Sequence, residues 1–138
     1  MIPRDLIFDD IKIGDSASFS RIWQEEDVQR FAELSGDTNP LHMDESYAKT
    51  TQFKQRLVHG MLVGSLCSTL VGLYLPGKHS LYLKQDFLFK KPVFIGDTTE
   101  IVGTVVSKSE STKIIFLSII IKKGKEVVIE GNASVQVI

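Results

Sequence analysis

The chain has 138 residues, of which 43% are hydrophobic and 24% are charged. This composition is typical of one globular domain with its own core and excludes a disordered chain. The formal net charge of −1 provides no basic excess that would favour nucleic acid or an anionic membrane as a partner. We therefore expect a single domain over residues 1–138.

The first part of the chain predicts one strand followed by two helices. Residues 1–10 lack the basic and then apolar pattern of a signal peptide. Polar and apolar residues alternate over 16–23, which predicts a strand. Residues 25–36 have apolar side chains near helical spacing, begin with acidic residues and end at a glycine, as helices do. Residues 44–51 predict a short helix that Asp44 caps.

The most apolar run is GMLVGSLCSTLVGLYL, over 60–75. It is short for a bilayer span, which needs about 20 residues, and it contains hydroxyl side chains. We expect this run to be the third helix, the most deeply buried one, apolar on nearly every side. Its cysteine, Cys67, is the only one in the chain and cannot form an internal disulfide. We expect it to be a packed apolar side chain, in a protein of the cytoplasm or, alternatively, of a soluble organelle matrix.

From residue 80 onward, the chain is rich in β-branched and aromatic residues, with turn residues between the runs. The sequence KKGK at 122–125 is typical of a β-hairpin. Four antiparallel strands are predicted, over 80–89, 97–110, 111–123 and 125–138. The order of elements predicts an α+β fold in which a curved antiparallel sheet wraps around the apolar helix.

The stretch SGDTNPLHMD places Asp37 five residues before His42. Pro40 fixes its own φ and restricts Asn39 before it, so the loop between the acid and the imidazole is stiffened. A carboxylate and an imidazole held in this way can share one water, activate it and return a proton. Taken alone, Asp37 would also fit a turn and His42 a hydrogen-bonded structural histidine.

The sequence HGML, over 59–62, opens the apolar helix. If the helix begins near Gly60, its first amides have no intrahelical partner and lie at the positive end of the helix dipole. Such amides can stabilise a negative charge that develops on a carbonyl oxygen, and glycine lets a ligand approach the backbone closely. This arrangement requires no metal and no other cofactor.

Taken together, these motifs resemble the MaoC-like (R)-specific enoyl-CoA hydratases, a branch of the hot-dog fold. The resemblance rests on FAELSGDTNPLHMD, HGML and LPGKHSLYLKQDFLFKKPVFIGDT, and it covers nearly the whole chain. It implies a hot-dog domain, a homodimer joined edge to edge through its sheets, and reversible syn addition of water to a trans-2-enoyl thioester. It assigns catalysis to Asp37, His42 and the Gly60 amide, and it places Ser68 beside the acyl chain.

Four residues are candidates for substrate contact, and each has a simpler alternative. Asn39 can bond to nearby backbone and close a turn. Ser68 also fits a packed small residue that bonds to its own helix. For His59 we favour a structural role, holding the loop before the helix. Arg56, like Lys90 and Lys91, is a candidate for coenzyme A phosphates, although solvated surface fits each of them.

A metal site built from Asp37, His42, Asp44 and His59 is a weaker hypothesis, because no cysteine or paired-histidine spacing supports it. We expect Asp44 to act as a helix cap and the site to hold no metal.

Other functions stay open at this stage. A 3-hydroxyacyl-acyl carrier protein dehydratase of fatty acid synthesis would use the same loop. A hot-dog acyl-CoA thioesterase would share the fold and the ligand, but the D-x-N-P-x-H loop favours hydration. A non-catalytic acyl-thioester sensor would need a further module, for which a compact, near-neutral chain leaves no room. The sequence specifies neither the carrier, coenzyme A or acyl carrier protein, nor the acyl length nor the pathway.

Overall fold

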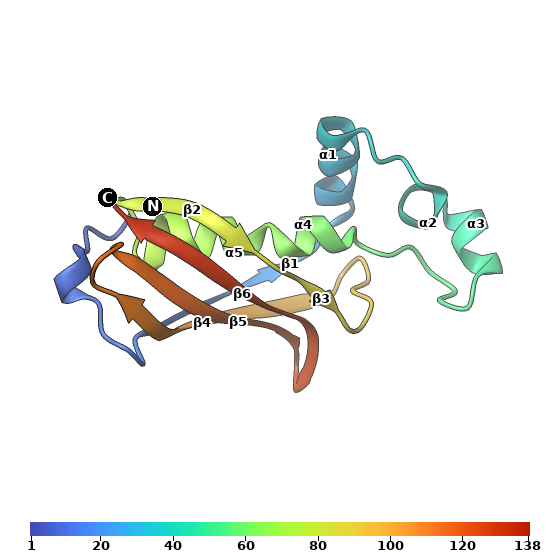
Figure 1. The fold of residues 1–138 in the computed structure, drawn as a ribbon. Coiled ribbons are helices and arrows are strands. Elements are labelled where there is room, and N and C mark those ends of the chain that lie inside the picture. The colour runs from blue at the N-terminus through green and yellow to red at the C-terminus, as the bar shows by residue number, and fades with distance from the viewer.

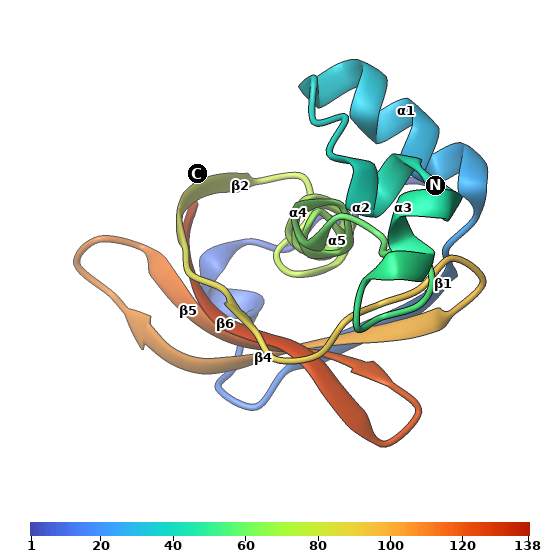
Figure 2. The ribbon, with the colours of Figure 1, turned by 90° about the vertical axis from the view of Figure 1, so that its right-hand side faces the viewer.

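The computed structural model describes residues 1–138. A curved antiparallel sheet encloses the helical residues 60–74, which form a rod along its concave side (Figures 1 and 2). The strand order is β1-β4-β5-β6-β2, and β3 pairs with β6 beyond the end of β2. Every strand pairing is antiparallel. The strands are β1 (Ser16–Ile22), β2 (Ser80–Gln85), β3 (Leu88–Phe89), β4 (Thr98–Ser109), β5 (Ile114–Lys123) and β6 (Glu126–Val137).

Apart from one short turn near the N-terminus, the helical elements form two groups. One group projects past the end of the sheet, and the other lies along its concave side (Figures 1 and 2). None of the helices has the length and apolar character that crossing a membrane requires. The helical elements are η1 (Phe8–Asp10), α1 (Glu25–Ser35), α2 (Pro40–Met43), α3 (Glu45–Thr50), α4 (Gly60–Gly64), α5 (Leu66–Thr69) and η2 (Leu70–Tyr74).

The sheet buries one face of each long strand, because successive side chains of a strand point to opposite faces. In β5, Ile115, Leu117, Ile119 and Ile121 all point into the core. The rod comes very close to the sheet at Gly103 of β4, where a Cβ atom would overlap the side chain of Leu70. These contacts form one continuous core that covers the concave side.

The predicted third helix is present as α4, α5 and η2 in succession, but one side of it is exposed and carries Ser65 and Ser68, so the expectation that it is apolar on nearly every side is wrong. Val63, Leu66 and Leu70 are buried against the sheet, whereas Met61, Ser65 and Ser68 are exposed. The exposed residues recur at helical spacing, so they form one stripe along the rod. The hydropathy of the run did not distinguish this stripe, because small side chains and a methionine interrupt it only weakly.

The other predicted elements are confirmed with small changes in their bounds. Gly36 adopts a left-handed conformation with φ 81° at the end of α1. Asp44 caps α3 by accepting a hydrogen bond from the Tyr47 amide. The β5–β6 hairpin turns at Gly124, with φ 59°. The strand predicted over 80–89 is divided into β2 and β3.

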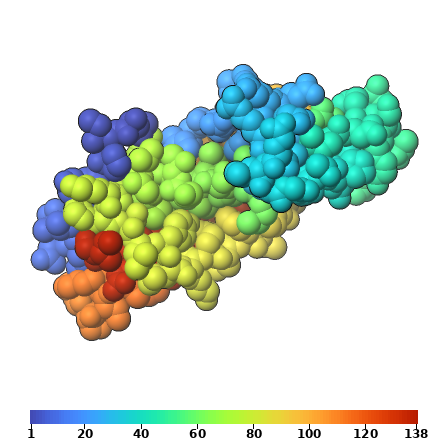
Figure 3. Space-filling model, turned by 90° about the horizontal axis from the view of Figure 1, so that it is seen from above, coloured from blue at the N-terminus to red at the C-terminus, as the bar shows by residue number.

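The segment that carries α1, α2 and α3 overhangs the end of the sheet beside the start of α4 (Figures 1 and 3). It connects β1 to the rod, and two of the three catalytic candidates, Asp37 and His42, lie in it. The candidate site therefore forms where this overhang meets the beginning of α4.

Candidate active site

The loop after α1 fixes the Asp37 carboxylate through backbone groups. The amide of Asp37 donates to Ser35 Oγ at 3.2 Å, and the amide of Asn39 donates to Asp37 Oδ1 at 3.2 Å. The aspartate thus closes a tight turn with one of its own oxygens. Its side chain is 50% exposed, so the other oxygen remains open to solvent and ligands.

The proline predicted to stiffen the loop starts a single helical turn, α2. Asn39 is its N-cap, and Asn39 Oδ1 accepts a hydrogen bond from the Leu41 amide at 2.9 Å. Pro40 occupies the first position of the turn, where a missing N–H costs nothing. Asn39 therefore shapes the loop, as one of the two sequence interpretations predicted, and α2 presents His42.

Residues 56–59 run alongside this loop and hold it. The Leu57 amide donates to the Leu41 carbonyl at 3.2 Å, and the Leu57 carbonyl accepts from His42 Nδ1 at 2.8 Å. Arg56 Nε donates to the His42 carbonyl at 2.6 Å. His59 Nε2 donates to the Asp37 carbonyl at 3.0 Å. The segment therefore contacts both ends of the loop.

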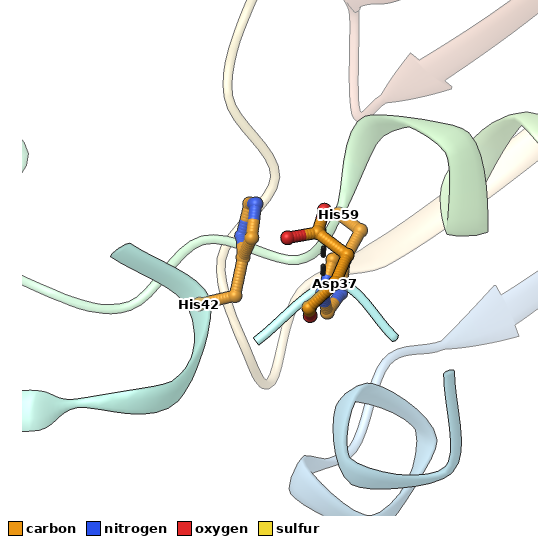
Figure 4. Close-up of side chains that lie close together, drawn as sticks. All are labelled: Asp37, His42 and His59. Atoms are coloured by element: carbon orange, nitrogen blue, oxygen red, sulfur yellow. Dashed lines mark hydrogen bonds and ion pairs between the residues drawn. The ribbon is translucent and has the colours of Figure 1, made fainter. Parts of the chain in front are cut away.

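Three of the predicted site residues converge at this point, namely Asp37, His42 and His59 (Figure 4). Their polar side-chain atoms all lie within 4.8 Å of one another. There is no direct hydrogen bond between the Asp37 carboxylate and His42. Groups within this limit can share one water that donates a hydrogen bond to each of them, since each such bond is about 2.8 Å long.

The hydrogen bond from His42 defines its tautomer. A carbonyl oxygen can only accept, so the bond to Leu57 requires the proton on Nδ1. The neutral ring then carries its lone pair on Nε2. His42 can accordingly accept a proton from a water at Nε2 and later return it.

His59 is in a different environment, with only 2% of its side chain exposed. Its Nδ1 is buried without a hydrogen-bond partner. Burial lowers the pKa of His59, and the neighbouring His42 acts in the same direction, while the bond to the Asp37 carbonyl and the Asp37 charge oppose them. His59 is therefore a neutral imidazole that carries its proton on Nε2.

A cavity of about 360 Å³ adjoins His42 and Gly60. Neither the Gly60 amide nor the Met61 amide donates a backbone hydrogen bond, which agrees with their place at the start of α4. Most of the cavity wall is apolar, and two lysines belong to it. The lining residues are His42, Phe53, Leu57, Val58, Gly60, Val63, Phe89, Lys90, Lys91, Pro92, Val93 and Ile129.

Arg56 and Ser68 lie in surroundings that differ from those of the cavity. The Arg56 side chain is 11% exposed and pairs with Glu25 at 2.7 Å in addition to its bond to His42. It thus links α1 to α2. Ser68 lies on the exposed stripe of the rod, beside a second cavity of about 250 Å³ that Tyr82 and Phe87 also line. The structure does not bring Ser68 to the converging trio.

The lysines and the thiol complete the predicted candidates. Lys90 lies 3.8 Å from Glu130, and Lys91 lines the main cavity without an acidic partner. Cys67 is buried, and burial raises the pKa of its thiol to about 12. A thiol with this pKa is protonated at neutral pH and is a poor nucleophile.

The geometry of the trio is explained by hydrogen bonding within the protein. A metal ligand must offer a lone pair, but His59 Nε2 holds its proton against the Asp37 carbonyl. Asp44, the fourth residue of the metal hypothesis, caps α3. These residues do not present the donor set that a metal site needs.

Two contributors were missed by the sequence analysis. Leu57 orients His42 through its carbonyl, and a backbone acceptor leaves no trace in the residue type. Phe89 lies directly over Gly60, where a Cβ atom would be 2.9 Å from its ring. The two phenylalanines in QDFLF could have indicated Phe89, but the same residues are equally typical of an ordinary strand.

Comparison with known proteins shows the family of the chain. The family model described as a MaoC like domain matches residues 10–124. The chain belongs to this family. It is 44% identical to the (R)-specific enoyl-CoA hydratase of Rhodospirillum rubrum, over 99% of this chain and 97% of that protein. It is 35% identical to the 3-hydroxybutyryl-CoA dehydratase of Methylorubrum extorquens, over 99% and 88%.

A solved structure of the (R)-hydratase from Aeromonas caviae superimposes on this MaoC-like chain with a TM-score of 0.90. The two share 40% sequence identity, over 93% of this chain and 98% of that one. The hot-dog fold expected from the resemblance is confirmed.

Proposed function

We propose that this MaoC-like protein is an (R)-specific enoyl-CoA hydratase that adds water reversibly to trans-2-enoyl thioesters. The observation that carries the proposal is the arrangement of Asp37 and His42. Their polar side-chain atoms lie within 4.8 Å of each other, close enough to share one water, beside a largely apolar cavity that His42 and Gly60 line. The names of the relatives support the same reaction.

The reaction follows from these three groups. A water between the Asp37 carboxylate and His42 Nε2 donates a hydrogen bond to each and directs its oxygen at C3 of the substrate. As the C3–O bond forms, one of the two bases takes the proton of the water. The C2–C3 double bond becomes an enolate whose charge lies on the thioester oxygen, where the Gly60 amide stabilises it.

The second half of the reaction returns a proton. The enolate collapses when C2 takes a proton from the group that received one, so water is added with no net change in charge. Because both bases lie on one side of the substrate, oxygen and hydrogen add to the same face. Syn addition is therefore the stereochemistry expected of this geometry.

We propose coenzyme A as the carrier of the enoyl group. Lys90 and Lys91 line the cavity that His42 and Gly60 share, and they offer positive charge to a phosphate-bearing carrier. The alternative is a 3-hydroxyacyl-acyl carrier protein dehydratase, which runs the same chemistry on a protein-bound thioester. A thioesterase is less well supported, since no activated nucleophile lies in the site and the thiol of Cys67 is buried.

We also propose that the enzyme works as a homodimer in the cytoplasm, with an organelle matrix as the alternative location. The dimer is supported by the unpaired sheet edges and the exposed apolar residues beside them. A reducing compartment is compatible with the buried, unbridged Cys67.

The test is an absorbance assay of enoyl-thioester hydration. Trans-2-enoyl groups of increasing length are offered on coenzyme A and on acyl carrier protein, and the product is resolved on a chiral column. We expect loss of enoyl absorbance and a product of the (R) series. A thiol reagent added in parallel detects thioester cleavage, and release of free thiol without hydration would identify a thioesterase instead.

A further inference from the structure

We propose that His59 is a positioning residue of this site, whose neutral ring holds the backbone of Asp37 and the ring of His42 in register for the shared water. The inference rests on the proposed function, because it assigns to His59 a part in hydration. It differs from a simple packing role in that it predicts a loss of turnover in folded enzyme.

The first observation is the stacking of the two imidazoles. The rings of His42 and His59 lie with centroids 4.0 Å apart and an interplanar angle of 29°. Phe31 of α1 packs on His59 with a centroid distance of 4.8 Å. His59 is thus held by α1 and in turn supports one face of the His42 ring. The other anchors of His42 are the bond from Nδ1 to Leu57, the bond from Arg56 to its carbonyl and the bond from its own amide to the Asn39 carbonyl, and none of these supports the face of the ring.

The second observation is the hydrogen bond to Asp37. His59 Nε2 donates to the Asp37 carbonyl at 3.0 Å, and the same nitrogen lies 4.0 Å from Asp37 Oδ2. The other anchors of Asp37 are a serine hydroxyl and its own tight turn. His59 therefore contacts both members of the catalytic pair.

The third observation is the place of His59 in the chain. It is the N-cap of α4, and the next residue is Gly60, which lines the substrate cavity and whose amide donates no backbone hydrogen bond. One residue thus connects the carboxylate, the imidazole and the amide that the mechanism requires. The distances among these three groups depend on its position, and an error of about 1 Å in such a constellation can cost 10²-fold in rate.

The positioning role of His59 requires that its ring be neutral. Its Nδ1 is buried with no partner, so a second proton would leave a charge without a hydrogen bond. The ionisable groups that face the ring are Asp37 and His42, and burial together with His42 lowers the pKa of His59. A neutral ring can stack on His42 without repelling the proton that His42 must carry during the reaction.

His59 has no contact with the substrate cavity. It is not among the cavity residues and is almost fully buried. A change at this position should therefore act on turnover and leave substrate affinity nearly unaltered. This separates a positioning role from substrate binding, for which His59 was a candidate on sequence grounds.

Two substitutions divide the contributions of the ring. His59→Gln retains an N–H that can reach the Asp37 carbonyl but loses the aromatic face. His59→Phe retains the face but loses the donor. We expect His59→Phe to lower kcat by about 10²-fold at nearly constant KM and His59→Gln to recover a large part of that loss. Phe31→Leu is the matched control, since it removes packing from His59 but keeps its donor.

Turnover is counted per folded enzyme, with the folded fraction measured by circular dichroism. Amide hydrogen exchange of residues 37–42 is measured in parallel and should accelerate in His59→Phe while the sheet stays protected. This second measurement needs no substrate. A parent enzyme without hydratase activity would therefore contradict the proposed function, while the exchange data would still test the positioning.

Three outcomes would overturn the inference. One is a folded His59→Phe enzyme with parental kcat and parental exchange at 37–42. Another is an equal loss in His59→Gln, His59→Phe and Phe31→Leu, which would indicate packing alone. The last is a rise in KM at parental kcat, which would identify His59 as a substrate contact.

Discussion

At the residue scale, the site depends on which atoms already have hydrogen-bond partners. His42 uses Nδ1 for the Leu57 carbonyl, and Asp37 uses Oδ1 for the Asn39 amide. Each side chain keeps one atom, Nε2 or Oδ2, without a protein hydrogen bond of its own. The chemistry is therefore concentrated on two atoms with fixed directions, which is what acid–base catalysis through one water requires.

Removing either atom should abolish most of the turnover. We expect Asp37→Asn and His42→Ala each to lower kcat by about 10²–10⁴-fold, the usual cost of losing acid–base catalysis. Folding should be nearly intact, because neither residue belongs to the buried core. The double variant should lose much less than the product of the single effects, since both residues act on one water. Steady-state kinetics with the hydration assay tests this, and near-parental turnover in either single variant would refute the assignment.

The thiol of Cys67 allows a pH prediction of known sign. Burial raises the pKa of Cys67 to about 12, whereas a thiol in an unfolded chain has a pKa of about 8.5. Between these two pKa values, the folded state therefore holds a proton that the unfolded state releases. The stability that the protonated thiol contributes is complete below the unfolded pKa and is lost as pH rises through the folded pKa. We expect the free energy of unfolding to fall more steeply with pH in this alkaline range for the parent than for Cys67→Ala. Urea titrations at several pH values measure it, and identical pH slopes for the two proteins would contradict the burial of the thiol.

At the element scale, the start of the rod both offers a backbone amide to the substrate in the proposed reaction and packs closely against two phenylalanines. Its two glycines in α4, Gly60 and Gly64, lie under the rings of Phe89 and Phe87. A Cβ atom at either glycine would be 2.9 Å from a ring carbon. Glycine is required at both positions because the phenylalanines approach the helix backbone directly, and at Gly60 because the substrate oxygen does so in the proposed reaction.

Substitution of Gly60 can separate these two requirements. Gly60→Ala should displace the thioester oxygen from the backbone amide, because the new methyl group crowds it, and lower kcat by about 10²–10³-fold, the cost of losing one oxyanion donor. It should also strain the contact with Phe89. Adding Phe89→Leu makes room for the new methyl group, and alanine is the better helix former by up to about 1 kcal/mol. We therefore expect the double variant to regain the parental melting temperature while its kcat stays low relative to Phe89→Leu alone.

Gly64→Ala with Phe87→Leu is the matched pair for this experiment. Gly64 has the same steric relationship to a phenylalanine but lies in the wall of the second cavity. There the single variant should lose stability and keep its turnover per folded enzyme on a short-chain substrate, which does not extend to the second cavity. Full recovery of turnover in Gly60→Ala/Phe89→Leu would show that the Gly60 amide is not the oxyanion donor.

The elements differ in how far the sequence could predict them. Alternation and the KKGK turn predicted β5 and β6 nearly to their ends, since a half-buried strand has a period that the residue types record. The break between β2 and β3 was missed, because it depends on Asp86, which bonds to the backbone of Asn132 on the neighbouring strand. The stiff loop around Pro40 was predicted, but the anchoring by Leu57 was not, because it depends on a backbone atom from another segment.

At the scale of the whole molecule, the sheet ends in two free edges. One edge is β1, and the other is formed by β2 and β3 together. Exposed strand edges invite pairing with a second chain. The two edges differ in their surroundings, since exposed apolar side chains gather at the second one and on the adjoining stripe of the rod. These residues are Met61, Leu81, Leu83, Leu88 and Phe89.

Pairing along the second edge would give a symmetric dimer and bury this apolar group. A partner there would also cover the second cavity, beside which Ser68 lies. That is the setting in which Ser68 could face an acyl chain, as the resemblance implies, although it is remote from the trio of its own chain. We expect light scattering of the full chain at micromolar concentration to give the mass of a dimer.

A charge at the edge should dissociate this dimer. Leu83→Lys places a solvated ammonium group on the β2 edge, a substitution that natural edge strands use to prevent pairing. We expect it to shift the protein toward the monomer and, if the second cavity is completed by the partner, to weaken activity on long acyl chains more than on short ones. Ile22→Lys is the matched control, because Ile22 is comparably exposed on β1, 58% against 49% for Leu83, and it should leave the dimer intact. A monomeric parent would contradict the dimer itself, and dissociation by Ile22→Lys alone would move the interface to the opposite edge of the sheet.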